Sequence, residues 1–106
     1  MENISIDKRA ALEIIMDDEA IIIDVRTPEE LEDVPPITDE VYNIPFNNEF
    51  INILEEEELD KDTKILVYCT HGIRSKKAVI LMRDKGFKNS YTLDGGLEAI
   101  LTSDGC

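Results

Sequence analysis

Cysteine and histidine are scarce in this chain, which has only two cysteines and one histidine among its 106 residues. Cys69 and Cys106 are too few for a scaffold held by disulfides, so we expect a reducing compartment. One histidine and two distant cysteines make no cluster of metal ligands. The sequence therefore predicts no metal site, and it offers no motif for another cofactor.

Long hydrophobic runs are also missing, since no apolar stretch approaches the roughly 18 residues of a membrane span. Residues 1–7 lack the basic and then apolar pattern of a signal peptide. We therefore expect a cytoplasmic protein that does not bind membranes. The chain length favours a single domain over residues 1–106, and we expect a monomer.

Basic residues are scarce over residues 1–63, which carry a net charge of −16. Residues 64–88 carry +6, residues 89–106 carry −3, and the whole chain carries −13. A chain this acidic is a poor partner for nucleic acid, and none is expected. The basic segment contains Cys69 and favours a small anion close to that residue.

The segment 64–75, KILVYCTHGIRS, predicts a buried strand that ends at Cys69, then a turn at Gly72, then a helix from about Ser75 to Lys85. A helix amino terminus and the turn amides both stabilise a thiolate at such a cysteine. Arg74 adds positive charge, and the turn has the character of an anion site. The alternative interpretation is a buried core cysteine with no chemical role.

The rest of the chain alternates between strand and helix patterns. It predicts a helix capped by Asp7 that ends near Met16, a strand over 20–25, a helix with a capping box from Thr27 to Glu30, a strand over 41–46, a helix capped by Asn47 or Asn48, a strand over 90–93, a helix over 97–101 and a disordered tail over 102–106. This alternation is typical of an α/β fold with a parallel sheet.

Asp24 and Arg26 follow the apolar run of the strand over 20–25. They should lie at the carboxyl end of that strand, which is where open α/β sheets place their sites. Two interpretations remain open for this pair. The residues either support the loop that follows Cys69, or form a local ion pair that only fixes their own turn.

Four segments together resemble the rhodanese-like sulfurtransferase family: CTHGIRS at 69–75, IIIDVRTPEE at 21–30, NIPF at 43–46 and YTLDGG at 91–96. The resemblance implies a three-layer α/β/α fold with a mostly parallel five-stranded sheet. Residues 31–40, LEDVPPITDE, replace a Gly-His-Ile-x-Gly-Ala stretch that is frequent in the family. Thr70 and His71 stand where many members that use thiosulfate carry an early basic residue.

The resemblance implies that Cys69 is the catalytic nucleophile of a thiosulfate sulfurtransferase-like enzyme. Its thiolate would take a sulfane sulfur from a small anionic donor, and a thiol or a cyanide-like acceptor would then remove that sulfur. A protein donor or acceptor is a further expectation. The loop that would stabilise these anions consists of Thr70, His71, Gly72, Ile73, Arg74 and Ser75. His71 is either an acid or base or an exposed loop side chain, and Cys106 either resolves the persulfide or is a tail thiol.

Two other functions fit parts of the pattern. Phosphatases and arsenate reductases wrap an oxyanion in a cysteine-to-arginine loop with five intervening residues. Here four residues separate Cys69 from Arg74, which should leave too little room for phosphate. The other alternative is a non-catalytic module whose acidic surface binds a basic partner.

Overall fold

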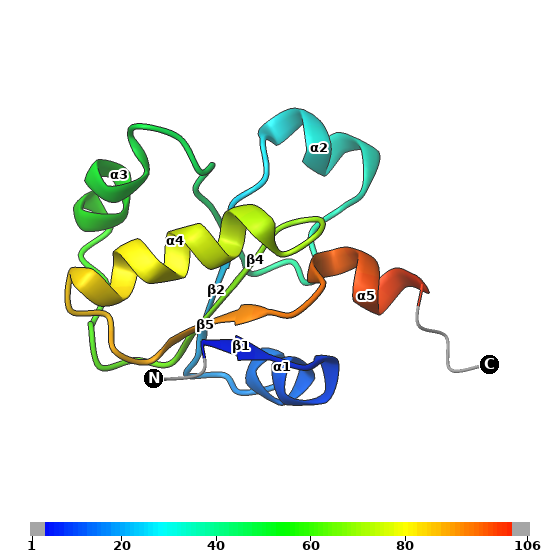
Figure 1. Cartoon of the computed structure of the whole chain (residues 1–106), viewed down its shortest axis with the longest axis horizontal. Coiled ribbons are helices and arrows are strands. Elements are labelled where there is room, and N and C mark those ends of the chain that lie inside the picture. The colour runs from blue at the N-terminus through cyan, green and yellow to red at the C-terminus, as the bar shows by residue number, and fades with distance from the viewer. Residues whose placement is uncertain (1–3, 103–106) are drawn as a thin grey trace.

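A computed structural model describes residues 4–102 of the chain. The strands are β1 (Ser5–Ile6), β2 (Ile21–Asp24), β3 (Tyr42–Asn43), β4 (Ile65–Tyr68) and β5 (Ser90–Leu93). The helices are α1 (Lys8–Ile15), α2 (Pro28–Asp33), α3 (Phe50–Glu56), α4 (Ile73–Asp84) and α5 (Gly96–Thr102). Figure 1 shows these elements with the sheet running through the middle of the molecule.

The five strands form one sheet in the order β1-β5-β4-β2-β3, and every neighbouring pair is parallel. The predicted α/β class and the five-stranded sheet are therefore confirmed, with a sheet that is parallel throughout rather than mostly parallel. The carboxyl ends of β2 and β4 lie side by side, because Asp24 is in register with Tyr68. The loops that carry the candidate site residues consequently meet at one edge of the sheet.

Two apolar clusters cover the two faces of the sheet. One face packs Ile23 and Val67 against α3 and α4, while the other packs Ile22 and Leu66 against α1 and α5. Alternate residues of a strand point to opposite faces, so each buried strand supplies both clusters. This arrangement confirms the three-layer order of helix, sheet and helix.

Several local predictions are wrong. The two-residue β1 was not predicted, and α4 begins at Ile73 rather than Ser75 because Gly72 takes a left-handed φ of 90° just before it. Neither Asn47 nor Asn48 caps α3: Glu49 does, without a side-chain bond, and Asn47 instead accepts a bond from the Glu49 amide. Thr102 ends α5 instead of starting a disordered tail, and residues 103–106 of that tail lie outside the described range.

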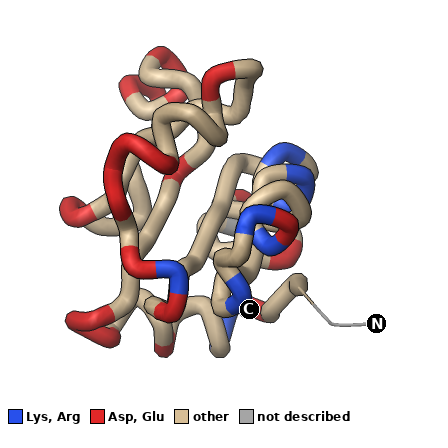
Figure 2. The backbone as a smooth tube through the Cα atoms, turned by 90° about the vertical axis from the view of Figure 1, so that its left-hand side faces the viewer, with Lys and Arg blue, Asp and Glu red and all other residues tan. Residues whose placement is uncertain are grey.

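Charge is distributed unevenly over the fold. Figure 2 shows acidic positions over much of the backbone and basic positions concentrated on one helix, which is α4 with Arg74, Lys76, Lys77 and Arg83. Within residues 4–102, no helix has the length and apolar character needed to cross a membrane.

Candidate active site

Cys69 directly follows β4 and begins the turn into α4. Its Sγ accepts hydrogen bonds from the backbone amides of Gly72, at 3.1 Å, and Ser75, at 3.3 Å. The Ser75 hydroxyl lies 3.5 Å from the same sulfur. Only 1% of Cys69 is exposed, so the turn encloses the sulfur in a nest of donors.

These contacts set the protonation of Cys69. Burial raises the pKa of the thiol, because a charged sulfur loses its hydration. The hydrogen bonds from the Ser75 hydroxyl and from the amides of Ser75, Gly72 and His71 act in the opposite direction and outweigh burial, so the pKa lies below its ordinary value. The site therefore shifts Cys69 toward the thiolate, the nucleophilic form, relative to an ordinary cysteine.

A second hydroxyl lies behind Ser75. The oxygens of Ser75 and Thr92 are 2.6 Å apart, and both side chains are buried. When the Ser75 hydroxyl donates to the Cys69 thiolate, its own oxygen is free to accept the Thr92 proton. The end of β5 thus contributes to the sulfur environment, a role that sequence reasoning did not assign to Thr92.

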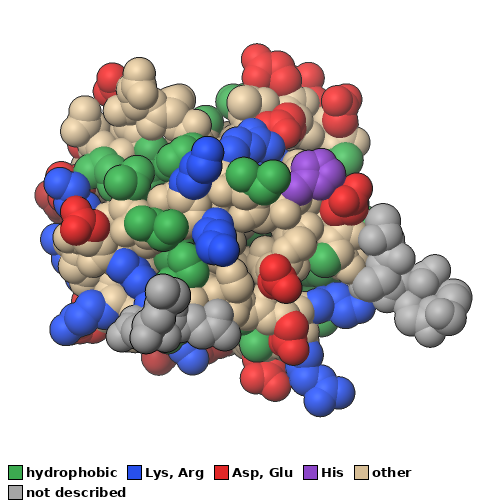
Figure 3. Space-filling model, in the orientation of Figure 1, with side chains coloured by type: hydrophobic (Ala, Val, Ile, Leu, Met, Phe, Trp, Pro, Cys, Tyr) green, Lys and Arg blue, Asp and Glu red, His purple; other side chains and the backbone are tan. Residues whose placement is uncertain are grey.

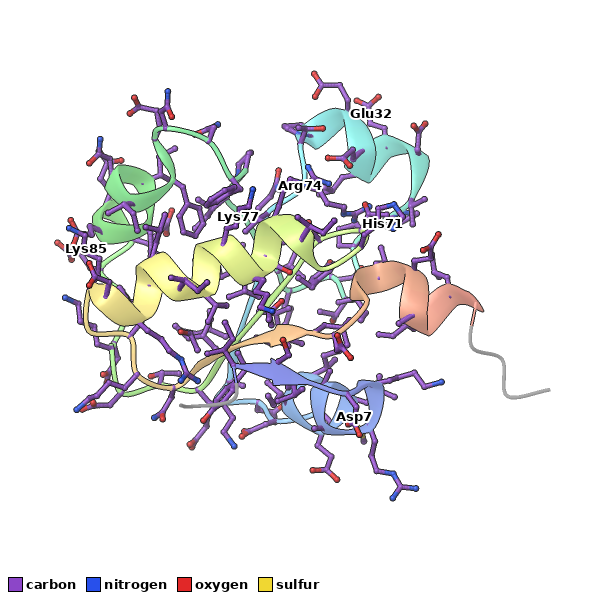
Figure 4. The ribbon with its side chains drawn as sticks, viewed as in Figure 1. Asp7, Glu32, His71, Arg74, Lys77 and Lys85 are labelled. Carbon is purple, nitrogen blue, oxygen red and sulfur yellow. The ribbon has the colours of Figure 1, made fainter. Side chains whose placement is uncertain are left out.

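Arg74 lies at the start of α4 and points toward α2, as Figure 4 shows. Its guanidinium donates two hydrogen bonds of 2.8 Å to the carboxylate of Glu30. That bond is the main reason why the pKa of Glu30 falls to about 2, with burial opposing it and the Thr27 amide adding to it. Arg74 is therefore occupied in tying α4 to α2, and its charge is largely balanced by its partner.

Glu30 serves two structures at once. The predicted capping box is confirmed, because the Thr27 side chain accepts from the Glu30 amide and the Glu30 carboxylate accepts from the Thr27 amide at 2.8 Å. The same carboxylate oxygen, Oε1, also accepts from Arg74. Sequence reasoning found the cap from its three-residue spacing but missed the contact with the cysteine loop.

Asp24 and Arg26 form a fully buried ion pair with a closest distance of 2.8 Å. Asp24 also accepts from the Arg26 backbone amide at 2.9 Å, which fixes the turn after β2. Neither side chain contacts Cys69 through a described hydrogen bond. The pair thus fixes its own turn, and its support of the loop after Cys69 stays a prediction.

The same arginine also supports a wall beside the site. Arg26 donates to the Val34 carbonyl at 2.9 Å, just beyond α2. The Tyr68 hydroxyl accepts from the Ile37 amide at 2.9 Å, and Asn43 donates to the carbonyls of Asp24 and Arg26. These bonds hold the irregular segment after α2, where the sequence departs from the family pattern.

Gly96 brings α5 against the cysteine loop. The Leu97 amide donates to the Cys69 carbonyl at 2.8 Å, and the Glu98 amide donates to the Thr70 carbonyl at 3.0 Å. A Cβ at Gly96 would lie 2.4 Å from the Thr70 oxygen, which explains the glycine. Sequence reasoning used Gly95-Gly96 only as part of the YTLDGG segment, although paired glycines before a helix are a signal of close backbone approach.

His71 lies at the outer rim of the loop. Its Nδ1 is 3.1 Å from the Glu98 carboxylate, and the two side chains are 59% and 55% exposed. Ile73 is also exposed. Among the described residues no three His, Cys, Asp or Glu side chains are grouped to hold a metal ion. Of the predicted loop residues, Gly72 and Ser75 contact the Cys69 sulfur. The His71 and Ile73 side chains are exposed, and Arg74 is directed to Glu30.

Comparison with known proteins matches the chain to the Rhodanese-like domain over residues 7–103. A tRNA uridine(34) hydroxylase of Erwinia tasmaniensis is 37% identical over 94 residues, covering 85% of this chain and 26% of that protein. A tRNA sulfurtransferase of Colwellia psychrerythraea is 40% identical over 72 residues, covering 66% of this chain and 14% of that protein. The chain thus spans only about a quarter or less of these two relatives.

Solved structures agree. A rhodanese-related protein from Thermoplasma volcanium is 29% identical, covers 94% of this chain and 92% of its own, and has a TM-score of 0.76. The human single-domain sulfurtransferase has a TM-score of 0.77 at 18% identity, covers 97% of this chain and 99% of its own, and shows the shared fold alone. The chain therefore belongs to the rhodanese-like domain family.

Proposed function

We propose that this domain is a sulfurtransferase that carries a sulfane sulfur on Cys69. The observation that carries the proposal is the sulfur nest: an enclosed Sγ with two amide donors and a hydroxyl within 3.5 Å. Donors held in place around a buried sulfur stabilise anionic sulfur in every state of the cycle.

The reaction consists of two balanced displacements. The Cys69 thiolate attacks the outer sulfur of a donor such as thiosulfate, the S–S bond of the donor breaks, and sulfite leaves with the electron pair. Cys69 then carries a persulfide anion. An acceptor thiolate attacks the outer sulfur, leaves as a persulfide, and returns the Cys69 thiolate, so no external oxidant or reductant is consumed.

The sulfur is proposed to serve tRNA modification rather than thiosulfate turnover itself. The proposal draws on the relatives, which are named for tRNA uridine hydroxylation and tRNA sulfur transfer. These names disagree with the sequence-based expectation that nucleic acid has no part. The two observations are compatible if this acidic domain loads the sulfur while other protein surfaces hold the tRNA, since its net charge of −13 disfavours RNA contact.

A phosphatase function is disfavoured by the same loop. Only four residues separate Cys69 from Arg74. Both terminal guanidinium nitrogens of Arg74 already donate to the Glu30 carboxylate. Little is left to grip a phosphate ester.

The experiment compares p-nitrophenyl phosphate with thiosulfate and a low-molecular-weight persulfide, using wild type and Cys69→Ser. We expect sulfur transfer from the sulfur donors to cyanide or a thiol, lost in Cys69→Ser, and no phosphate release. Phosphate release that depends on Cys69 would reverse the choice of reaction. Sulfur transfer that survives in Cys69→Ser would remove Cys69 from its proposed role.

A further inference from the structure

One exposed face of α4 is both apolar and basic. Ile73 and Ile80 are 65% and 54% exposed, and Lys76 and Lys77 lie between them on exposed positions. Spacings of three, four and seven residues place these four side chains on one side of the helix. Figure 3 shows blue and green side chains side by side along this helix, and we call Ile73, Lys76, Lys77 and Ile80 the α4 surface.

The α4 surface carries positive charge near the amino terminus of the helix, where positive charge is unfavourable. The first turn of α4 has no acidic residue, and the lysines that follow it bring positive charge to the end where the helix dipole favours negative charge. Lys76 and Lys77 have no ion-pair partner among residues 4–102. An unfavourable charge that no ion pair balances is typical of a functional position.

The α4 surface borders a groove that reaches the cysteine loop. A cavity of about 260 Å³ is lined by all four of its residues and by the loop residues His71 and Gly72. The opposite wall comes from the end of β5 and the turn after it, at Thr92, Leu93 and the exposed Asp94, so the lysines face an acidic residue across the groove. Because the Gly72 amide bonds the Cys69 sulfur at 3.1 Å, a chain bound in this groove would lie beside the reactive turn.

We propose that the α4 surface binds an acidic segment of a partner protein that carries an apolar side chain, and that this segment presents a thiol or persulfide to Cys69. The lysines meet the acidic groups, and the isoleucines bury the apolar side chain. The sulfur-exchange part rests on the proposed function, whereas the binding part does not.

The surface fits a protein better than RNA. Two exposed isoleucines would gain nothing against a phosphate backbone, and none of the four side chains is an aromatic or an arginine on which a base stacks. An acidic protein segment with an apolar side chain satisfies both halves of the surface at once.

The test uses fluorescein-labelled synthetic peptides of about fifteen residues and measures binding by fluorescence anisotropy. One peptide is an acidic amphipathic helix with leucines on one face and a terminal cysteine. A second peptide replaces the leucines by serine, a third replaces the acidic residues by lysine, and an unmodified tRNA transcript is the nucleic-acid probe. We expect the first peptide to bind at least tenfold more tightly than the other two peptides and than the tRNA.

The protein variants separate position from net charge. Lys76→Glu with Lys77→Glu should weaken the first peptide at least tenfold, while Lys85→Glu with Lys88→Glu, which changes net charge equally, should weaken it less than twofold. Lys85 lies at the far end of α4 (Figure 4). The first pair adds acidic groups near the helix amino terminus, where the dipole favours them, so unfolding is not the expected cause of lost binding.

Three results would overturn the proposal: equal weakening by both variant pairs, equal binding of the leucine and serine peptides, or tighter binding of tRNA that depends on Lys76 and Lys77. Anisotropy requires no turnover, so it tests the surface separately from the chemistry. Peptide binding without any sulfur uptake by Cys69 would support the α4 surface as a binding site and contradict the proposed sulfurtransferase function. Sulfur uptake without selective peptide binding would support that function and contradict the binding site.

Discussion

Gly96→Ala should disrupt the contact between α5 and the cysteine loop. The new Cβ would lie 2.4 Å from the Thr70 oxygen and 2.6 Å from the Cys69 oxygen, closer than backbone atoms allow. The loop or α5 must therefore move, and the two amide bonds to these carbonyls, at 2.8 and 3.0 Å, are lost. Two hydrogen bonds at about 0.5–1.5 kcal/mol each and a left-handed backbone at about 1–2 kcal/mol predict a loss of about 2–5 kcal/mol.

Gly86→Ala is the matched control. Gly86 has a φ of 101°, which is at least as unfavourable for alanine as the 69° of Gly96, but its Cβ would meet only the Lys61 side chain, at 3.3 Å. Its cost should be the backbone term alone, about 1–2 kcal/mol. Urea unfolding gives the free energy of unfolding of both variants. It is followed by far-ultraviolet circular dichroism because the chain has no tryptophan whose fluorescence could report unfolding. A free energy of unfolding for Gly96→Ala that equals or exceeds that of Gly86→Ala would refute the close-approach argument.

Three further substitutions test other contacts. Glu30→Gln should make the free energy of unfolding less sensitive to acid. The pKa of Glu30 is lowered from 4.5 to about 2, so its stabilisation is present above about pH 4.5 and is lost as the pH falls through about 2. The free energies of unfolding at pH 7 and pH 3 should therefore differ less in the variant than in wild type, by up to about 1 kcal/mol for a partly exposed pair. Thr92→Val should raise the pKa of Cys69, because the Ser75 hydroxyl loses its contact with the Thr92 hydroxyl and donates less strongly to the sulfur. The pH dependence of iodoacetamide alkylation measures this pKa, and an unchanged profile would show that Thr92 does not act on Cys69 through Ser75. Asp24→Asn should cost about 3–5 kcal/mol by leaving the buried Arg26 charge unpaired, more than Asp24→Asn with Arg26→Met, and the reverse order would contradict the buried-pair account.

Local signals in the sequence predicted local structure well. The threonine and glutamate three residues apart predicted the capping box at Thr27, and the apolar run over residues 65–68 predicted β4, both of which are confirmed. The β1 strand was missed because two residues show no period. It exists through its parallel pairing with β5, where Ser5 is in register with Thr92 across most of the chain.

The candidate site was predictable where one segment carries it and unpredictable where distant segments meet. The loop over residues 69–75 is continuous, so its turn around the cysteine followed from Gly72 and the helix behind it. The contacts of Glu30 with Arg74 and of Thr92 with Ser75 join residues 44 and 17 positions apart. Such pairs depend on how β2, β4 and β5 are ordered in the sheet, which the periodicity of a single sequence does not specify.

The most direct test of the central proposal is intact-protein mass spectrometry after exposure to thiosulfate or a small persulfide. Wild type and Cys106→Ser should each gain the mass of one sulfur atom, mapped by peptide analysis to Cys69 and removed by a thiol acceptor. Cys69→Ser should remain folded by circular dichroism and gain none. Sulfur that maps to Cys106, or a Cys69→Ser variant that still takes up and passes on sulfur, would contradict the account.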